Sequence, residues 1–320
     1  MIKDKKNLIS VLMSAFNSEN YIAEAIQSIL TQSYPYFELI ISDDGSTDNT
    51  KSVIDSFNDI RIKKYHNKSN IGKAKTINKI YKYSTGELIT IHDADDISLT
   101  KRFEKIIEFF RDYHDFYMCG HKIERISESG KTLGLYREKL KSFEDIKKNM
   151  ELENTDGDAS IFIKREVCED LGSIFRPYFQ NNMDYDLALR IIEKYKSSNI
   201  DEVLYYYRNN PRSISKNIPN YKILITQKLT QFFYQERKDK GIDSLEEENW
   251  DLIKTKENDF SIPYKNDNTL YLRETAARMM YYQMNKEAVK YSWQAIIKEP
   301  FKLINWRTLQ YCLRKSIIKI

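Results

Sequence analysis

The chain has 320 residues, of which 41% are hydrophobic and 31% are charged, a balance typical of a folded globular protein rather than a disordered one. Its formal net charge of +4 is too small to indicate a nucleic-acid-binding protein. The three cysteines show no C-x-x-C spacing, which excludes the usual disulfide framework and zinc patterns. No segment reaches the roughly 20 apolar residues that span a bilayer, and the N-terminal residues lack the apolar centre of a signal peptide. We therefore expect a cytoplasmic protein.

The first hundred residues alternate between short apolar strands and amphipathic helices. The pattern predicts strands over residues 8–13, 37–42, 60–65 and 88–92, with a helix after each of the first three. This order predicts an α/β fold with a largely parallel sheet and helices on both faces. Each predicted strand except the third ends in polar residues. Because the carboxyl ends of parallel strands meet at one rim, we expect three polar clusters to converge there on a ligand.

The remaining chain divides into a mixed part and a helical part. Helices are predicted over residues 101–113 and 184–195, and strands near residues 116–125, 159–164 and 203–207. Residues 221–320 lack strand alternation and are predicted to be helical, with a polar interruption around residues 239–268. A boundary near Pro219 gives an α/β domain over residues 1–218 and a C-terminal helical domain over residues 219–320.

The fourth predicted strand ends in three carboxylates within four residues, Asp93, Asp95 and Asp96. Carboxylates crowded at a strand end repel one another unless a cation or several donors compensate them. Oxygen ligands of this kind suit Mg²⁺ or Mn²⁺. The alternative is an acidic surface turn, since Asp is common in turns. The polar clusters after the earlier strands favour the metal site.

Five segments in order, LISVLMSAFN (8–17), SILTQSY (28–34), ELIISDDGSTD (38–48), GELI (86–89) and DADD (93–96), resemble the family 2 glycosyltransferases. The resemblance is strong over residues 7–112 and weaker to about residue 218. It implies a GT-A fold, a Rossmann-like, mostly parallel sheet flanked by helices, followed here by the helical domain. It also implies an inverting transfer from a nucleotide-diphosphate sugar, a UDP-sugar by preference, with Mn²⁺ or Mg²⁺ as cofactor. The acceptor would be a glycan, a glycoprotein or a lipid-linked molecule.

The resemblance assigns the nucleotide to the loops after the first two strands. The backbone around Ser14, Phe16 and Asn17 would hold the uridine together with Asp44. A carboxylate there can accept hydrogen bonds from the base or the ribose. Asp43 could contact the uridine in place of Asp44. Otherwise, Asp43 is a residue that caps a turn.

The D-x-D pair and a lysine would serve the diphosphate. Asp95 would bind the metal directly, and Asp93 would face the ribose or a metal-bound water. Asp96 would cap the next helix or contact the acceptor. Lys73 lies in a segment that resembles the N-x-G-K-A-x-A-x-N variant of the family, although Thr76-Ile77-Asn78 departs from the Ala-Arg-Asn of many members. Lys73 would supply a point charge for phosphate or base, or else is a solvated lysine.

The general base and one further metal contact are placed by the downstream segments. Residues 183–190 resemble the E-D-x-D-L…R segment of the family, and this resemblance implies that Asp184 is the general base. The alternative is that Asp184 and Asp186 only stabilise the N-terminus of a helix through their negative charge. Asn210 stands where the family often has a His that reaches the metal or diphosphate. Arg208 would contact phosphate or form a surface salt bridge.

Two alternatives stay open at this point, and a third is disfavoured. A catalytically inactive glycosyltransferase-like scaffold would also fit the loss of the usual His and Ala-Arg. A nucleotidyltransferase would need a G-x-G-x-R loop after the first strand, which is absent. The basic segment 301–320 predicts a helix that either packs on the domain or a sister subunit, or rests on an anionic leaflet at the inner face of the cell membrane. One face of that helix would carry Trp306, Leu309, Leu313, Ile317 and Ile320.

Overall fold

The computed structural model describes residues 7–136, 140–154, 159–210, 220–281 and 284–317. The chain forms two compact units, residues 1–213 and 214–320. The boundary predicted near residue 218 falls within residues 211–219, which lie outside the described part of the chain.

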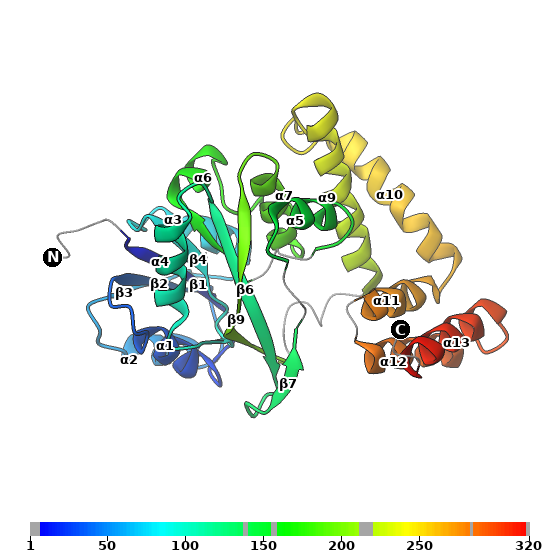
Figure 1. Cartoon of the computed structure of the whole chain (residues 1–320), viewed down its shortest axis with the longest axis horizontal. Coiled ribbons are helices and arrows are strands. Elements are labelled where there is room, and N and C mark those ends of the chain that lie inside the picture. The colour runs from blue at the N-terminus through cyan, green and yellow to red at the C-terminus, as the bar shows by residue number, and fades with distance from the viewer. Residues whose placement is uncertain (1–6, 137–139, 155–158, 211–219, 282–283, 318–320) are drawn as a thin grey trace. The chain divides into compact units, whose positions relative to one another are not determined.

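The first unit is built on a nine-stranded sheet (Figure 1). The strand order is β3-β2-β1-β4-β8-β6-β9-β5, and β7 pairs with β6. The first four strands along the chain run parallel to one another, as the alternation of strand and helix predicts. They are β1 (Ile9–Ala15), β2 (Phe37–Asp43), β3 (Ile62–His66) and β4 (Leu88–Ile91).

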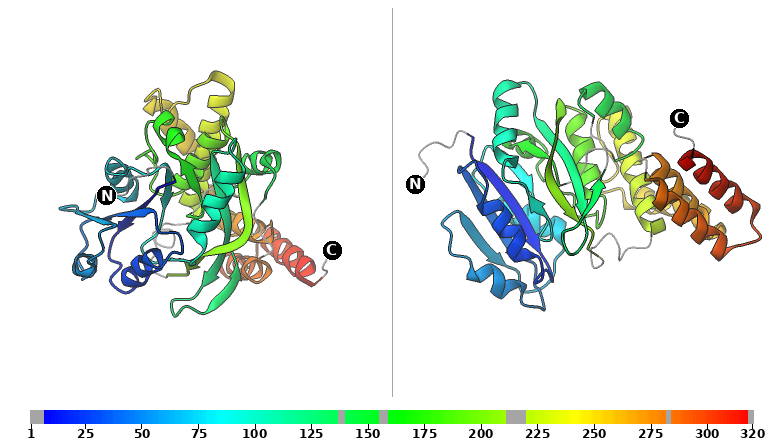
Figure 2. Two further views of the ribbon diagram at one scale, coloured as in Figure 1. Left: turned by 60° about the vertical axis from the view of Figure 1, so that its left-hand side comes forward. Right: turned by 60° about the horizontal axis from the view of Figure 1, so that its bottom comes forward.

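Helices lie on both faces of these strands because side chains on both faces of β1 are buried (Figures 1 and 2). Ile9, Val11 and Met13 belong to one core cluster with side chains of α1 (Ile22–Leu30), α2 (Thr50–Ser56) and α4 (Arg102–Asp112). The helix α3 (Lys73–Tyr81) contacts β1 and β2 without contributing to that cluster, so it covers the opposite face. The α/β architecture predicted from the sequence is therefore confirmed.

Several further helices and strands complete the first unit. Those found near their predicted positions are β6 (Met118–Ile126), β8 (Phe162–Lys164), α7 (Met183–Ile192) and β9 (Ser197–Arg208). The sequence pattern missed β5 (Ile97–Ser98), β7 (Thr132–Leu135), α5 (Phe143–Met150) and α6 (Arg165–Asp170). Each has at most eight residues, too few for a hydrophobic period to stand out. β9 is longer than predicted because it pairs with both β6 and β5.

The second unit consists of helices: α9 (Asn220–Lys240), α10 (Trp250–Asn266), α11 (Leu270–Tyr281), α12 (Asn285–Lys298) and α13 (Leu303–Ile317). The polar interruption predicted around residues 239–268 is wrong for most of that range, since α10 occupies it. Only Ile253, Ser261 and Tyr264 of α10 are buried, so its exposed polar face hides the helical period. Among the described helices, none has both the length and the apolar character needed to cross a membrane.

The apolar face predicted for the C-terminal helix is correct only in part. Leu309 is buried, but Trp306 and Leu313 are exposed to 46% and 40%. The stripe of α13 that packs inward is instead formed by Asn305, Leu309 and Cys312. The predicted positions at residues 317 and 320 lie outside the described side chains.

Candidate functional site

The site lies at the rim where β1, β2 and β4 end side by side. Ala15 is in register with Asp43, and the amide of Asp44 donates to the carbonyl of Ala15 (2.7 Å). The amide of His92, one residue beyond β4, donates to the carbonyl of Leu12 (3.0 Å). The polar clusters that follow these three strands therefore share one edge of the sheet, as predicted.

The loop after β1 is joined to the loop after β2. Asn17 adopts a left-handed backbone (φ 48°), its amide donates to Ser46 Oγ (2.9 Å), and its Oδ1 accepts from the Thr47 amide (2.9 Å). Ser14 is half-buried at the end of β1, and the Phe16 ring is 43% exposed. Asn17 thus shapes the rim, and Ser14 and Phe16 lie on it.

Asp44 organises the loop before α3. Its carboxylate accepts hydrogen bonds from Asn67 Nδ2 (2.8 Å), from the Ile71 amide (3.0 Å) and from the Gly72 amide (2.9 Å). A carboxylate offers about four acceptor positions, so these three bonds use most of its capacity. Asp44 therefore determines where α3 begins, and its predicted contact with uridine stays a prediction.

The turn between Asp43 and Ser46 requires glycine at its centre. Gly45 has φ 73°, and a Cβ atom there would lie 2.5 Å from the carbonyl carbon of Ser69. Asp43 is buried, and its Oδ1 accepts from the Ser46 amide (3.2 Å), so the turn-capping alternative is observed. Its role toward a nucleotide stays a prediction.

Lys73, the first residue of α3, reaches Asp93 and pairs with its carboxylate. Burial opposes the lysine's charge, but the carboxylates of Asp93, Asp184 and Asp96 together raise the pKa of Lys73 above its ordinary value. The ammonium is therefore charged at neutral pH, and it lies among acids that come from two different parts of the chain, the D-x-D segment and the start of α7.

The backbone at Asp93 is held by two buried rings. His92 Nδ1 donates to the carbonyl of Asp93 (2.7 Å), and the amide of Asp93 donates to the hydroxyl of Tyr205 (3.3 Å). Burial and the charge of Arg102 lower the pKa of His92 to about 3, so the ring is neutral near pH 7. His92 acts here as a support, and it is a residue to which the sequence assigned no role.

Asp95 and Asp96 differ in their partners. Asn210 Nδ2 donates to Asp95 Oδ2 (2.8 Å), so Asn210 reaches the D-x-D segment from the end of β9. Burial, together with the Asp93 charge, raises the pKa of Asp95, and the Asn210 bond opposes that rise. Asp96 is fully buried and accepts from the Arg208 amide (2.8 Å). It does not cap α4, whose N-terminal residue Lys101 has no side-chain cap, so that expectation was wrong.

Arg208 is engaged on all sides. Its Nε donates to the carbonyl of Asp95 (2.8 Å), its Nη1 to the carbonyl of Glu128 (2.7 Å), and its Nη2 pairs with Glu24 (2.5 Å). The guanidinium also lies over the ring of Tyr21, 5.0 Å from its centroid. The Arg208 side chain is only 3% exposed, but that of Glu24 is 56% exposed, so the salt bridge that was one expectation is present and reaches the surface on its Glu24 side. Arg208 holds the backbone of Asp95, and its predicted phosphate contact stays a prediction.

The donor set suits a hard divalent cation that the substrate helps to bind. Within the described residues, no three His, Cys, Asp or Glu side chains are grouped as a metal site. Mg²⁺ and Mn²⁺ sites of nucleotide-dependent enzymes commonly use one or two carboxylates and complete the shell with phosphate oxygens and water. Asp95, oriented by Asn210 and crowded by Asp93, fits that arrangement. A cation there would relieve the repulsion from Asp93, which adds to the effect of burial in raising the pKa of Asp95.

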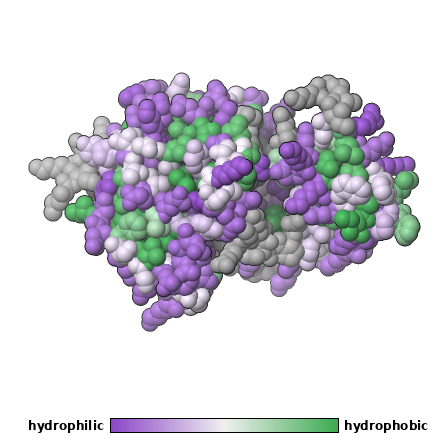
Figure 3. Space-filling view, turned by 90° about the horizontal axis from the view of Figure 1, so that it is seen from below, coloured by the Kyte–Doolittle hydropathy of each residue, from purple (hydrophilic) through white to green (hydrophobic). Residues whose placement is uncertain are grey.

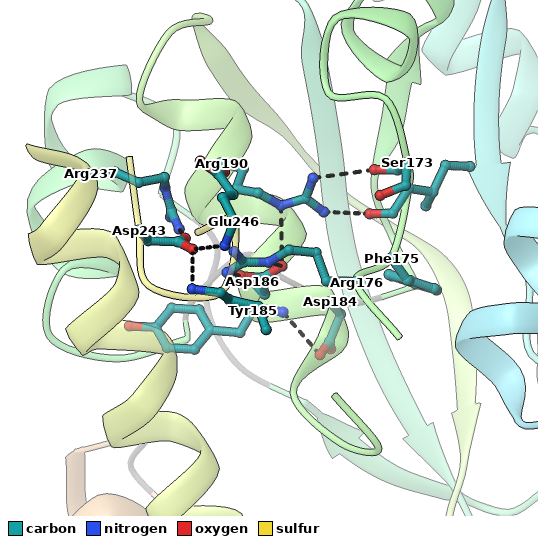
Figure 4. A network of polar contacts seen from close by, with 12 residues as sticks. Ser173, Phe175, Arg176, Asp184, Tyr185, Asp186, Arg190, Arg237, Asp243 and Glu246 are labelled. Carbon is teal, nitrogen blue, oxygen red and sulfur yellow. Dashed lines mark hydrogen bonds and ion pairs between the residues drawn. The ribbon is translucent and has the colours of Figure 1, made fainter. Parts of the chain in front are cut away.

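Asp184 and Asp186 begin α7 but point to different surroundings (Figure 4). Asp184 is partly exposed, and its Oδ1 accepts from the Tyr185 amide (3.0 Å). Asp186 has no exposed surface and accepts from Arg176 Nε (3.0 Å) and Arg190 Nε (3.1 Å). Asp186 is therefore a structural residue, whereas Asp184 is close enough to the site for its charge to act on Lys73.

One backbone segment, residues 174–176, connects α7 with α3. Asn78 of α3 donates to the carbonyl of Phe175 (2.6 Å) and accepts from its amide (3.0 Å). Arg190 of α7 donates to the carbonyl of Ile174 (2.5 Å). The helices that carry Lys73 and Asp184 therefore form hydrogen bonds with the same segment. Asn78 belongs to the motif that contains Lys73, but its contact with residues 174–176 does not follow from that motif.

The comparisons with known proteins agree with this arrangement. The family described as "Glycosyl transferase family 2" matches residues 10–172. An uncharacterized glycosyltransferase of Methanocaldococcus jannaschii is 30% identical over 208 residues, which cover 63% of this chain and 71% of that protein. Residues 1–349 of Staphylococcus aureus TarS in complex with UDP-GlcNAc share the fold with a TM-score of 0.61 and 18% identity, covering 97% of this chain and 88% of that one. The mannosyltransferase PcManGT from Pyrobaculum calidifontis, in complex with GDP-Man and Mn²⁺, gives a TM-score of 0.54 at 16% identity, covering 97% and 87%.

Proposed function

Because the chain belongs to glycosyl transferase family 2 and is a glycosyltransferase, we propose that it is a metal-dependent, inverting enzyme. It would move a sugar from a nucleotide-diphosphate donor to a hydroxyl of a glycan or glycoconjugate. The observation that carries the proposal is the meeting of Lys73, the D-x-D acids and Asp184 at the rim where the parallel strands β1, β2 and β4 end. These residues supply a cation for phosphate, ligands for a metal and a carboxylate base.

The donor in this proposal is a UDP-sugar. The loops that carry Ser14, Phe16 and Asn17 would hold the uridine beside Asp43 and Asp44. The exposed Phe16 ring offers an aromatic surface to a base, which supports this placement. The TarS complex with UDP-GlcNAc, which shares the fold, lends further support.

The metal in this proposal is Mn²⁺ or Mg²⁺, with Asp95 as its direct ligand. When bound, such an ion neutralises the diphosphate leaving group. Asn210 keeps the Asp95 carboxylate oriented, and Arg208 keeps its backbone in place. Lys73 carries a positive charge beside Asp93, where it can contact a phosphate oxygen. The PcManGT complex with Mn²⁺ supports the choice of ion.

The base in this proposal is Asp184. In a single displacement, the acceptor oxygen forms a bond to the anomeric carbon as the bond to the diphosphate breaks on the opposite face of the sugar. Asp184 takes the proton of the acceptor hydroxyl during that step. Its partly exposed place at the start of α7, with Asp186 anchoring the same turn, leaves it accessible to an acceptor.

The acceptor is proposed to be a glycan, a glycoprotein or a lipid-linked molecule at the inner face of the cell membrane. The C-terminal helices would serve contacts with the acceptor, with the membrane surface or with a second subunit. The competing proposal, an inactive scaffold, rests on the loss of the usual His and Ala-Arg, whereas the presence of Asp95, Asp184 and Lys73 supports an active enzyme.

The proposal is tested by donor turnover in two variants and a control. Asp184→Asn should lower sugar transfer by about 10²–10⁴-fold, the usual contribution of a general base, and leave UDP affinity unchanged in calorimetry. Asp95→Ala should abolish both transfer and the metal dependence of UDP binding. Asp170→Asn, which changes a surface ion pair with Lys194, should behave as wild type.

Three outcomes would overturn parts of the proposal. Full activity of the wild type in excess EDTA would show that the transfer needs no metal ion. Loss of UDP binding in Asp184→Asn, in parallel with activity, would make Asp184 a binding residue. Tight UDP binding without turnover of any UDP-sugar offered, with Mn²⁺ present, would favour the inactive scaffold.

A further inference from the structure

The end of the second unit exposes an unusual number of large apolar side chains. Phe301 is fully exposed, Ile297 is 76% exposed and Leu303 is 63% exposed. In total, eight large apolar or aromatic side chains are exposed within 21 residues: Trp293, Ile297, Phe301, Leu303, Ile304, Trp306, Tyr311 and Leu313. Figure 3 shows apolar side chains gathered over the C-terminal helices at its right-hand end. Exposed apolar side chains gathered in one region mark an interaction site, unlike single exposed residues.

Six of these side chains, all except Tyr311 and Leu313, belong to one ordered structure, the α12–α13 tip, defined here as residues 293–307. The rings of Trp293 and Trp306 meet edge to face with centroids 6.2 Å apart, and Trp306 Nε1 donates to the carbonyl of Pro300 (2.8 Å). Asn305 Nδ2 donates to the carbonyls of Ala295 (2.9 Å) and Glu299 (3.0 Å). The connecting turn is therefore tied to both helices, and the exposed apolar residues are presented together.

The exposed face is not the one that holds the helices together. Ala276, Ala288 and Cys312 form the core cluster among α11, α12 and α13, and Leu309 is buried on the same side of α13 as Cys312. Helical spacing places Leu303, Arg307 and Arg314 along a different stripe. The exposed apolar residues of the tip are therefore not part of that core cluster.

The surroundings of the tip are basic. Residues 290–317 contain six lysines and arginines but one acidic residue, Glu299, which pairs with Lys302 (3.0 Å). Arg307, Arg314 and Lys315 are exposed, and they form no ion pair with any described residue. An apolar tip beside uncompensated positive charge is complementary to the surface of an anionic bilayer.

We propose that the α12–α13 tip is a membrane-docking surface. Ile297, Phe301 and Leu303 insert at the boundary between headgroups and acyl chains, while Arg307 and Arg314 bind anionic headgroups. A second copy of the chain fits this surface less well, because a two-fold contact brings the same positive charges of both subunits together. The docking does not depend on the transfer reaction, so each can fail without the other.

Vesicle co-sedimentation of the full chain tests the surface. The wild type should bind vesicles containing an anionic phospholipid, should bind zwitterionic vesicles more weakly, and should lose affinity as salt is added. The double variant Ile297→Ser/Phe301→Ser should bind at least about tenfold more weakly, since it removes the inserting side chains. Arg307→Glu/Arg314→Glu should lose the preference for anionic lipid. Ile60→Ser is the matched control, because Ile60 is equally exposed but lies in the first unit.

The alternatives give distinct results. All variants should keep wild-type circular dichroism and donor hydrolysis, because every changed side chain is exposed. If the wild type ignores anionic vesicles, the membrane proposal is wrong. If the tip variants instead have a lower sedimentation coefficient than the wild type, the surface is a contact between subunits. Equal loss of vesicle binding in Ile60→Ser would also refute a specific role for the tip.

Discussion

The cluster of Asp186 with Arg176 and Arg190 makes a quantitative prediction about what keeps α7 in place (Figure 4). Asp186 has no exposed surface, and the side chains of Arg190 and Arg176 are 5% and 10% exposed. Asp186 accepts hydrogen bonds from both guanidinium groups. The variant Asp186→Asn removes the negative charge and turns an amide NH₂ toward guanidinium N–H groups, which cannot accept from it.

The expected loss is large compared with the stability of a domain. Removing one partner of a buried ion pair costs about 3–5 kcal/mol because the remaining charges are left without compensation. For a domain of 150–250 residues, each kcal/mol lowers the melting temperature by about 2–4 °C. Asp186→Asn should therefore melt roughly 6–20 °C below the wild type. Since a typical domain has only about 5–15 kcal/mol of stability, the variant should fold at low temperature but with little margin.

Scanning calorimetry of the full chain measures this, with the transition of the first unit as the readout. Asp170→Asn is the control, because Asp170 pairs with Lys194 at 3.1 Å in the same unit, with side chains that are 42% and 60% exposed. Surface pairs of this kind contribute little, so its melting temperature should stay within experimental scatter. Equal shifts in the two variants, or none in Asp186→Asn, would refute the reasoning that burial makes the difference.

Two further predictions concern the support of the D-x-D segment. Asn210→Ala removes the hydrogen bond that opposes the rise in the pKa of Asp95, so the carboxylate ionises only at higher pH. The acidic limb of the pH profile of the transfer rate should therefore shift to higher pH. An unchanged limb would show that Asp95 ionisation does not limit the rate. Arg208→Gln breaks the pair with Glu24 and the bond to the Asp95 carbonyl, so turnover should fall and the Mn²⁺ concentration for half-maximal rate should rise. Glu24→Gln, which leaves the bond to that carbonyl, should have the smaller effect, and equal effects would contradict a positioning role.

The sequence by itself determined the class of fold, the family and the place of the site. Short apolar runs separated by helices dictate a parallel sheet, and a parallel sheet brings its carboxyl strand ends to one rim. The meeting of the loops after β1, β2 and β4 follows from that topology alone. The acids of the D-x-D segment could therefore be predicted as part of a site before any contact was known.

Tertiary structure alone decided what each polar residue does there. Asp184 and Asp186 look equivalent in sequence, but residues two apart on a helix face different directions, so one is partly exposed and the other is buried between arginines. Arg208 pairs with Glu24 across 184 residues of chain, a separation that no local pattern reports. The short elements β5 and β7 likewise exist because longer strands pair with them. Local patterns record periodicity and turn chemistry, whereas burial and long-range pairing depend on which distant segments the fold brings together.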